Sequence, residues 1–351
     1  MKVSLVTRAV GISAMAAVGL TACGGSGSGG GTGGGGTSVH GSGSTFQSAL
    51  EQQWTSQFSG GQVSYNPVGS STGQQQLADG NVDFAGSDVT IDPTLKDKID
   101  SRCGGSALTL PVTAGGVAII YNLPGVDTLK LDADTIAKIF QGAITKWNDP
   151  AIAQQNSGVT LPSTAITPVH RSDGSGTTGV LSAYLDSQAK GVWTLGADTT
   201  LNWPANAGQA AAGSDGVTQA VSQTQGGITY AEQSYVKGSL KAAEVKNAKG
   251  NYVELGPDAV STSIGDGFRV TGSGHDLSGT LDFGAMAGYP LATVSYVIVC
   301  QKYGDATIAQ TVKAFVTYAV TDGQQFAGQL GFAPLPQSLA SKVKKSLDSV
   351  S

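Results

Sequence analysis

Charged residues are scarce in this chain of 351 residues, at 13% of the sequence, and the formal net charge is −5. Lys and Arg together number 20 and form no basic stripe, so nucleic-acid binding is not expected. The overall negative field also repels small anions. Such a chain can bind an anion only through local backbone dipoles and a well-placed cation.

Histidine and cysteine are equally scarce, with three residues of each type. They lie far apart in the sequence, at His40, His170, His275, Cys23, Cys103 and Cys300. No metal-ligand spacing is visible among them, so the sequence predicts no metal site and no cofactor. A Walker phosphate loop and an identifiable pair of base and nucleophile are also missing. An enzyme is therefore not expected.

The apolar run at residues 9–20 is too short to span a bilayer with ease as a helix. It follows Lys2 and Arg8, which is typical of an export signal. The run ends in Leu20-Thr21-Ala22-Cys23, which resembles the lipobox of bacterial lipoproteins. This resemblance implies a signal peptide at 1–22, cleavage before Cys23 and acylation of its thiol. An ordinary signal peptide with a chance cysteine is the alternative.

The segment 23–38 consists almost entirely of Gly, Ser and Thr after the cysteine, so it cannot bury a core. We interpret it as a tether between the lipid and a soluble body. Outside the cytosol disulfides can persist, and Cys103 and Cys300 remain for one. A disulfide between them is favoured over two separate buried thiols, and it would place both segments in the same domain.

The segment Arg171 to Thr178 (RSDGSGTT) combines one guanidinium, one carboxylate, four hydroxyls and two glycines. It follows a short apolar strand and precedes a run that is typical of a helix. Free backbone N–H groups and the positive end of the helix dipole would lie beside a fixed cation, which suits a tetrahedral oxyanion. Asp173 can hold the guanidinium of Arg171 in one orientation. A glycine-rich surface turn is the plainer alternative.

Three further small polar segments lie at the ends of predicted strands, at 41–46 (GSGSTF), 69–73 (GSSTG) and 83–88 (DFAGSD), the last being a short strand that ends in a carboxylate. Taken singly, their serines and Asp88 are ordinary helix caps or turn residues. Strands alternate with helices along the chain, which predicts an α/β protein with mainly parallel sheets flanked by helices. Ligands of such sheets bind at the carboxyl ends of the strands, where all four segments fall.

These segments also carry a family resemblance. Their order and approximate spacing resemble those of the phosphate-binding proteins of bacterial ABC uptake systems, which belong to the periplasmic-binding-protein superfamily. The matching segments are 41–46, 69–71, 83–88, 146–149 (KWND), 171–177 and 226–230 (GGITY). The resemblance covers nearly everything after the tether and is weakest at 238–288. It implies a type II periplasmic-binding-protein fold with two lobes that close over inorganic phosphate. Lobe I would comprise 39–114 and 293–351, and lobe II 115–292.

The resemblance also implies a set of phosphate ligands at matching positions. These are the Thr45 hydroxyl, the Phe46 backbone N–H, the Ser70 hydroxyl, Asp88 as the acceptor of a phosphate proton, Arg171 braced by Asp173, and the turn of Ser175, Gly176 and Thr177. This chain departs from the family at two positions, neither of them a direct ligand position. Gln47 stands where a proline is usual, and His170 where a second basic residue often precedes the arginine.

The resemblance implies an exported protein, anchored to the outer face of the cell membrane by a lipid on Cys23. It would bind phosphate as a monomer and deliver it to the membrane permease subunits of an ABC transporter. Two other classes of protein remain as alternatives, a secreted phosphatase and a surface adhesion protein. A protein that binds another oxyanion such as sulfate would belong to the same class as the phosphate-binding protein. Release of phenol from an aryl phosphate would identify a phosphatase, and an adhesion protein should not bind phosphate.

Overall fold

A nine-stranded sheet forms the centre of the structure, a computed structural model that describes residues 38–351. Eight strands lie side by side in the order β2-β1-β3-β14-β4-β8-β6-β7, and β9 pairs with β4. The bounds are β1 Ser38–Gly43, β2 Gln62–Pro67, β3 Phe84–Ser87, β4 Ala107–Asn122, β6 Thr167–Arg171, β7 Gln209–Ala211, β8 Gly227–Glu232, β9 Lys241–Ala242 and β14 Ala292–Cys300. The predicted signal peptide, Cys23 and nearly all of the tether lie outside the described residues.

The strands pair in parallel at both ends of this sheet and antiparallel at its centre. At one end β1 is parallel to β2 and β3, and at the other end β6 is parallel to β7 and β8. Between them, β14 is antiparallel to β3 and β4, and β4 is antiparallel to β8. The expected α/β class is confirmed, and its parallel strands lie at the two ends of the sheet.

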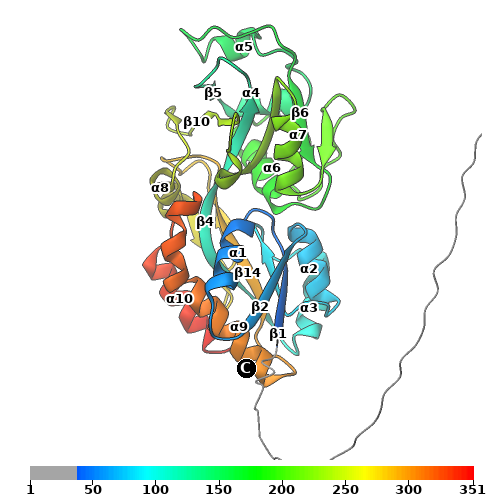
Figure 1. The fold of residues 1–351 in the computed structure, drawn as a ribbon, viewed down its shortest axis with the longest axis vertical. Helices are drawn as coiled ribbons and strands as arrows, with labels where there is room; N and C mark the ends of the chain where they lie inside the picture. The colour runs from blue at the N-terminus through cyan, green and yellow to red at the C-terminus, as the bar shows by residue number, and fades with distance from the viewer. Residues whose placement is uncertain (1–37) are drawn as a thin grey trace, which may run out of the picture. The chain divides into compact units, whose positions relative to one another are not determined.

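The strand β4 connects two groups of elements that are visible in Figure 1. All of its residues are buried, the first half pairing with β14 and the second half with β8. The sequence predicts two strands here, at 107–112 and 116–121, and the structure joins them into one. Gly115 and Gly116 lie at the join. A Cβ on Gly116 would meet Leu255 at 2.2 Å, so glycine lets neighbouring side chains close over a continuous strand.

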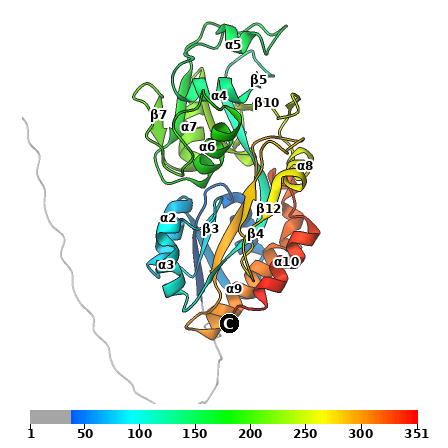
Figure 2. The same cartoon turned by 180° about the vertical axis from the view of Figure 1, so that it is seen from behind.

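Helices cover the sheet in both groups, as Figures 1 and 2 show. Around β1, β3 and β14 lie α1 Ser48–Gln57, α2 Ser70–Ala78, α3 Pro93–Arg102, α9 Ala306–Ala319 and α10 Gln337–Leu347. Around β6 and β8 lie α4 Ala133–Phe140, α6 Gly176–Gln188 and α7 Gly213–Ser222, and the short α5 Pro150–Ala153 lies at the far end of this group (Figures 1 and 2). Asp132 caps α4, because its carboxylate accepts the N–H of Thr135 at 2.9 Å.

The segment that resists assignment from sequence contains small elements. They are β10 Glu244–Lys246, β11 Tyr252–Val253, α8 Pro257–Gly267, β12 Phe268–Val270 and β13 Gly279–Leu281, and β10 joins β5 Lys130–Leu131 in a separate sheet. The hairpin of β12 and β13 returns to β4, where the N–H of Leu277 donates to the carbonyl of Thr109. Within residues 38–351, no helix has the length and apolar character needed to cross a membrane.

Two aromatic clusters fill the core on either side of the join in β4. In the first group Phe84 packs on Phe315 of α9, with ring centroids 5.7 Å apart. In the second group Phe140 of α4 meets Tyr230 of β8 at 5.5 Å. Phe46, Trp54 and Phe58 recur at the spacing of one helical face, and all three are buried or half-buried.

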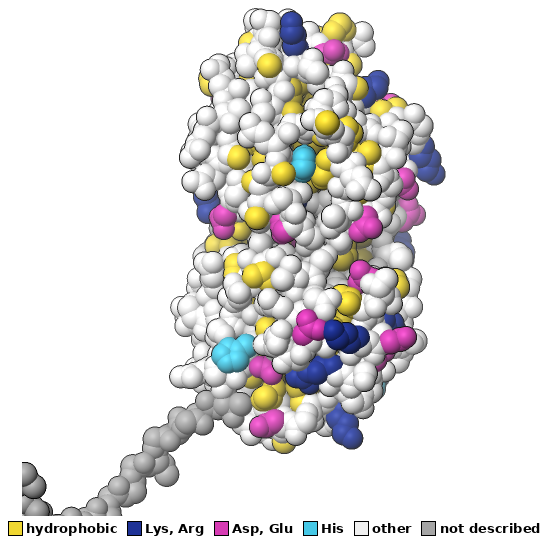
Figure 3. Space-filling view, turned by 90° about the vertical axis from the view of Figure 1, so that its right-hand side faces the viewer, with side chains coloured by type: hydrophobic (Ala, Val, Ile, Leu, Met, Phe, Trp, Pro, Cys, Tyr) yellow, Lys and Arg dark blue, Asp and Glu magenta, His cyan; other side chains and the backbone are white. Residues whose placement is uncertain are grey.

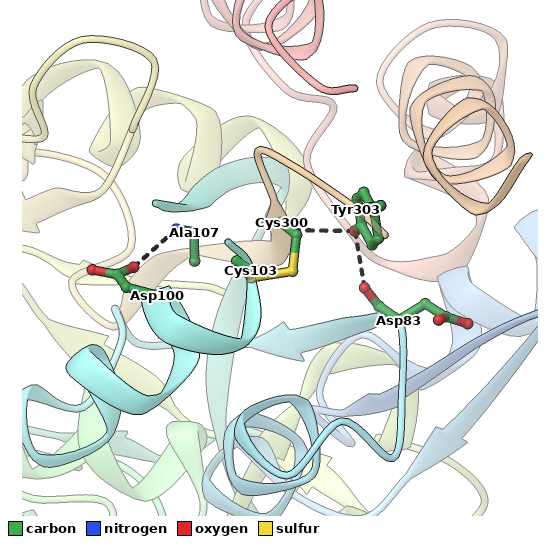
Figure 4. Close-up of a disulfide and its surroundings, with 6 residues drawn as sticks. All are labelled: Asp83, Asp100, Cys103, Ala107, Cys300 and Tyr303. Atoms are coloured by element: carbon green, nitrogen blue, oxygen red, sulfur yellow. Dashed lines mark hydrogen bonds between the residues drawn. A yellow bond between two sulfur atoms is a disulfide. The ribbon is translucent and has the colours of Figure 1, made fainter. Parts of the chain in front are cut away.

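Cys103 and Cys300 form the expected disulfide, with their Cα atoms 4.8 Å apart across 197 residues of sequence. Figure 4 shows it between the end of α3 and the end of β14. Beside it, the N–H of Cys300 donates to the Tyr303 hydroxyl, which donates in turn to the carbonyl of Asp83. The bond thus ties an early segment to a late one within one group of elements, as predicted.

Candidate functional site

The amino termini of four helices, α1, α2, α6 and α7, meet at one place in the structure. The turn before α1 contacts the start of α7, where Thr45 Oγ1 lies 2.9 Å from Ser214 Oγ. The start of α2 contacts the turn before α6, where the N–H of Ser71 donates to the carbonyl of Gly174. Unpaired N–H groups and positive dipole ends gather at such helix starts. The convergence of the small polar segments, predicted from their positions at strand ends, is confirmed.

Arg171 lies at the end of β6 and is 4% exposed. Its Nε and Nη2 atoms donate to the two carboxylate oxygens of Asp173 at 2.7 and 2.5 Å, a bidentate pair. Nη1 points the other way, 3.5 Å from Ser214 Oγ. Burial raises the pKa of Asp173, but the hydrogen bonds and charge of Arg171 outweigh it and leave that pKa below its usual value. The pair is therefore charged at neutral pH, with one side of the guanidinium turned to the site.

Asp88 follows β3 and is 4% exposed. Its Oδ1 accepts hydrogen bonds from the hydroxyls of Ser44 and Ser295 at 2.7 and 2.6 Å. Its Oδ2 faces the hydroxyl of Thr177 at 3.4 Å. Burial raises the pKa of Asp88 above its usual value, although these hydroxyls and Arg171 act in the opposite direction. A buried carboxyl is thus held among donors at the centre of the site.

The first turn of α6 packs directly against Asp88 and Ser70. A Cβ on Gly176 would lie 2.4 Å from Ser70 Oγ and 2.8 Å from Asp88 Cβ, so glycine alone fits. Ser175 caps the helix by accepting the N–H of Thr178 at 3.2 Å. The N–H groups of Gly176 and Thr177 belong to the first turn and have no partner within the helix. Ser70 Oγ accepts the N–H of Asp88 at 3.3 Å.

The turn before α1 supplies the other side of the site. Thr45 Oγ1 accepts the N–H of Ser214 at 3.2 Å, and the Thr45 carbonyl accepts the Tyr235 hydroxyl at 3.1 Å. The backbone N–H of Phe46, expected to face the ligand, donates to Ser44 Oγ at 3.0 Å in this structure. All nine predicted site residues thus lie at the starts of α1, α2 and α6, just after β3, or at the end of β6 and in the turn that follows it.

Several residues at the site are not among those predicted. Ser44 lies inside the first polar segment, and Ser214 follows a glycine at a predicted helix start, so both carry a signal that could have pointed to them. Ser295 lies within an apolar strand and has no such signal. His170 stacks on Trp203 with ring centroids 4.5 Å apart, and burial lowers its pKa, so it adds no charge near neutral pH. Among the residues described, no three His, Cys, Asp or Glu side chains are grouped to hold a metal ion.

Charged side chains elsewhere do not extend the site. On the face shown in Figure 3, basic and acidic side chains are sparse and intermixed, with no basic patch. Lys96 and Lys98 of α3, for example, pair with Asp100 and Asp79. At the site itself, Arg171 and the helix termini around it are the groups that attract an anion.

The chain matches the family model described as a PBP superfamily domain over residues 28–323. It is 38% identical to the phosphate-binding protein PstS2 of Mycobacterium bovis (strain BCG / Pasteur 1173P2), over 98% of each chain. It is 32% identical to the phosphate-binding protein PstS of Pasteurella multocida (strain Pm70), over 88% of this chain and 89% of that protein. These matches extend across both groups of elements.

Solved structures show the same fold. A high affinity periplasmic phosphate-binding protein (PfluDING) bound with phosphate superposes with a TM-score of 0.74 at 24% identity, covering 88% of this chain and 93% of that chain. A phosphate-binding protein from Stenotrophomonas maltophilia gives 0.72 at 23% identity with the same coverage. The expected periplasmic-binding-protein fold is thereby confirmed.

Proposed function

Because the chain belongs to the PBP superfamily, with phosphate-binding proteins as relatives at 32–38% identity, we propose that it binds inorganic phosphate outside the cytoplasm for import. The observation that carries this proposal is that hydrogen-bond donors and a hydrogen-bond acceptor meet at one buried site. Arg171 and the starts of four helices offer donors and positive charge, and Asp88 offers an acceptor. A tetrahedral anion that still carries a proton satisfies both kinds of group.

The proposed ligand atoms divide accordingly. Donors are the hydroxyls of Thr45, Ser70, Ser175 and Thr177, the N–H groups of Phe46 and of the first turn of α6 at Gly176, and the guanidinium of Arg171. Asp88 Oδ2 accepts the proton of the phosphate, because Oδ1 already accepts two hydroxyls. Asp173 does not touch the anion and holds the guanidinium in place. Phe46 would exchange its present partner, Ser44, for the ligand.

We place the ligand between two lobes, 39–114 with 293–351 and 115–292. The site residues divide between them, with Thr45, Ser70 and Asp88 on the first lobe and Arg171 and Thr177 on the second. Their direct contacts, such as Asp88 with Thr177, correspond to a closed arrangement. The hairpin of β12 and β13 belongs to the second lobe by sequence, yet it hydrogen-bonds to Thr109 of the first. Closure would therefore bend the chain near the middle of β4 rather than at this hairpin.

The proposed partners are phosphate and the permease subunits of an ABC phosphate transporter, with the protein acting as a monomer and not as an enzyme. Its role would be to hold the anion and release it to the transporter unchanged. In the part of the chain that the structure describes, no hydroxyl of the site is hydrogen-bonded to a histidine. The carboxylate that accepts from Ser44, Ser295 and Thr177 is Asp88, to which we assign the proton of the phosphate rather than the activation of a nucleophile.

Phosphate should raise the thermal stability of the protein, because a ligand that bridges two lobes stabilises only the closed form. At a hundredfold excess of phosphate over its dissociation constant, the free energy of unfolding should rise by about 2.7 kcal/mol. A thermal melt with increasing phosphate measures this, with chloride at equal ionic strength as the control. A melting temperature unchanged by saturating phosphate would refute the proposed function.

We also propose that the protein is held at the outer face of the cell membrane by a lipid on Cys23, although this residue lies outside the described part of the chain. The resemblance of residues 20–23 to a lipobox supports this. Cys23→Ser should move the protein from the membrane fraction to the soluble fraction, and Cys103→Ser serves as the control for loss of a cysteine. Retention of the Cys23→Ser protein in the membrane fraction would contradict the anchor.

A further inference from the structure

Gln47 is the residue that stands where the related family usually has a proline, and its side chain is fully buried in this structure. Its Nε2 donates to Ser295 Oγ at 2.9 Å and to the carbonyl of Tyr296 at 3.1 Å. Because a carbonyl can only accept, the amide group that faces both atoms must be the NH₂. Gln47 therefore presents a fixed donor to the hydroxyl of Ser295.

This donor determines where the single hydrogen of Ser295 points. The hydroxyl accepts from Gln47, so its own hydrogen is free to be donated. Two acceptors are in reach, Asp88 Oδ1 at 2.6 Å and the carbonyl of Ser87 at 3.4 Å, and the shorter contact is the stronger bond. Ser295 lies where the pairing of β14 with β4 shifts register, an irregularity of the kind that re-aims a side chain.

The hydroxyl of Ser44, the second donor to Asp88 Oδ1, is arranged in the same way. Its oxygen accepts the N–H of Phe46 at 3.0 Å, and its hydrogen is donated to Asp88 Oδ1 at 2.7 Å. Two hydroxyls, each fixed by an N–H group behind it, thus donate to the same carboxylate oxygen. Oδ1 cannot carry a proton while both bonds are made, so a proton on Asp88 would have to lie on Oδ2.

We propose that Gln47 and Ser295 determine anion specificity without touching the anion, by saturating Oδ1 of Asp88 and so keeping its Oδ2 an obligatory proton acceptor. This inference rests on the proposed function, since it assumes that Oδ2 faces the bound anion. Phosphate can donate a proton to Oδ2 near neutral pH. Sulfate cannot, and it meets a bare carboxylate.

Asp88 needs these hydroxyl donors to stay charged, because its burial favours the neutral acid. Burial favours the neutral acid and raises the pKa of Asp88, whereas the hydroxyl donors, with Ser295 the largest of them, and the charge of Arg171 lower it. The charged and titratable groups facing Asp88 are Arg171 from β6 and Tyr65 from β2, whose hydroxyl donates to the carbonyl of Ser44. Losing the Ser295 bond should raise the pKa of Asp88 further. A protonated Asp88 is a hydrogen-bond donor, and its O–H can donate to an oxygen of sulfate.

The direction of the effect with pH follows. In the native protein sulfate binding should appear only at acidic pH, where Asp88 takes up a proton. In Gln47→Met and Ser295→Ala, Asp88 should take up this proton at a higher pH. A hydrogen bond to a charged group corresponds to about tenfold in such an equilibrium, so at a given pH above this transition sulfate should bind about tenfold more tightly than to the native protein. Phosphate binding should change less, because phosphate and Asp88 still share a single proton.

The test is calorimetric titration of phosphate and of sulfate into the native protein and both variants between about pH 5 and about pH 8. Ser295→Thr, which keeps the hydroxyl, should restore the native profile. Gln74→Met is a matched control. Gln74 is also a buried glutamine that donates to a serine hydroxyl, but that serine, Ser87, donates to the carbonyl of Val89 and not to Asp88.

The possible results distinguish a failure of the inference about Gln47 and Ser295 from a failure of the proposed phosphate-binding function. A native protein that fails to bind phosphate refutes the proposed function. If the native protein binds phosphate and the variants lose both anions in parallel, with no displacement of the sulfate profile along pH, Gln47 and Ser295 are merely structural and the inference is wrong. If Ser295→Ala does not fold by circular dichroism, Gln47→Met decides alone, since it changes the orientation of the hydroxyl and leaves Ser295 in place.

Discussion

Arg171→Ala should weaken phosphate binding by about 2–5 kcal/mol, or roughly thirtyfold to several thousandfold, as for loss of one partner of a buried charge pair. The guanidinium is nearly inaccessible to solvent, and its bidentate bond to Asp173 fixes the one side that remains for the ligand. Removing it takes away the basic group that reaches the site and leaves Asp173 without its partner. Calorimetric titration of phosphate measures the loss.

Two further variants are needed to interpret the loss of affinity in Arg171→Ala. Arg171→Lys should recover only part of the affinity, because an ammonium group cannot reproduce the planar fork that binds Asp173. Lys302→Ala removes a positive charge from an exposed position beside the disulfide and should leave the affinity nearly unchanged. A loss of less than about tenfold in Arg171→Ala would mean that the anion binds elsewhere.

Asp88→Asn should shift the preference of the protein from phosphate towards sulfate. A buried site built for a donor rejects an analogue that lacks it by about 10⁴–10⁵. In the native protein sulfate would place an oxygen without a hydrogen against a carboxylate, which is both an unsatisfied acceptor and a like-charge contact. The asparagine removes the charge and supplies an amide donor, so the ratio of the two affinities should fall by several orders of magnitude.

The control for this variant is Asp92→Asn, which removes a negative charge four residues away. Asparagine can still cap α3 there, as Asp92 does by accepting the N–H of Thr94. Titration of both anions into both variants and the native protein measures the preference. Tight binding of sulfate to the native protein, or unchanged discrimination in Asp88→Asn, would contradict the role given to Asp88.

Much of the site could be predicted because its residues lie in short local patterns. Glycines and hydroxyls between a strand and a helix indicate a turn that exposes N–H groups, and the segment around Arg171 shows this pattern clearly. The end of a parallel strand is also a defined place in an α/β fold, so patterns far apart in sequence could be expected to meet. The contact of Asp88 with Thr177, across 89 residues, confirms this for the described chain.

Residues that act from inside regular elements could not be found in this way. Ser295 lies in the strand 292–300, where its neighbours are apolar and a serine reads as an ordinary small residue. Its contact with Asp88 depends on the pairing of β14 with β3 and β4, which is set by tertiary structure. In the sequence Gln47 stands out only as a departure from the family pattern, and its partners likewise lie more than 240 residues away.

At two places the local sequence also does not predict where the strands begin and end. The apolar runs 107–112 and 116–121 are predicted as two separate strands. In the structure β4 continues through Gly115 and Gly116, where Phe46 and Leu255 approach the backbone. The stretch 238–288 has strands of only two or three residues, too short for an alternating pattern to be read.

The most direct test of the central claim is isothermal titration of phosphate and sulfate into the purified native protein near neutral pH. The arrangement of Arg171, four helix termini and Asp88 predicts saturable binding of phosphate at one site and no measurable binding of sulfate under the same conditions. Absence of phosphate binding, or binding of both anions with similar affinity, would contradict it.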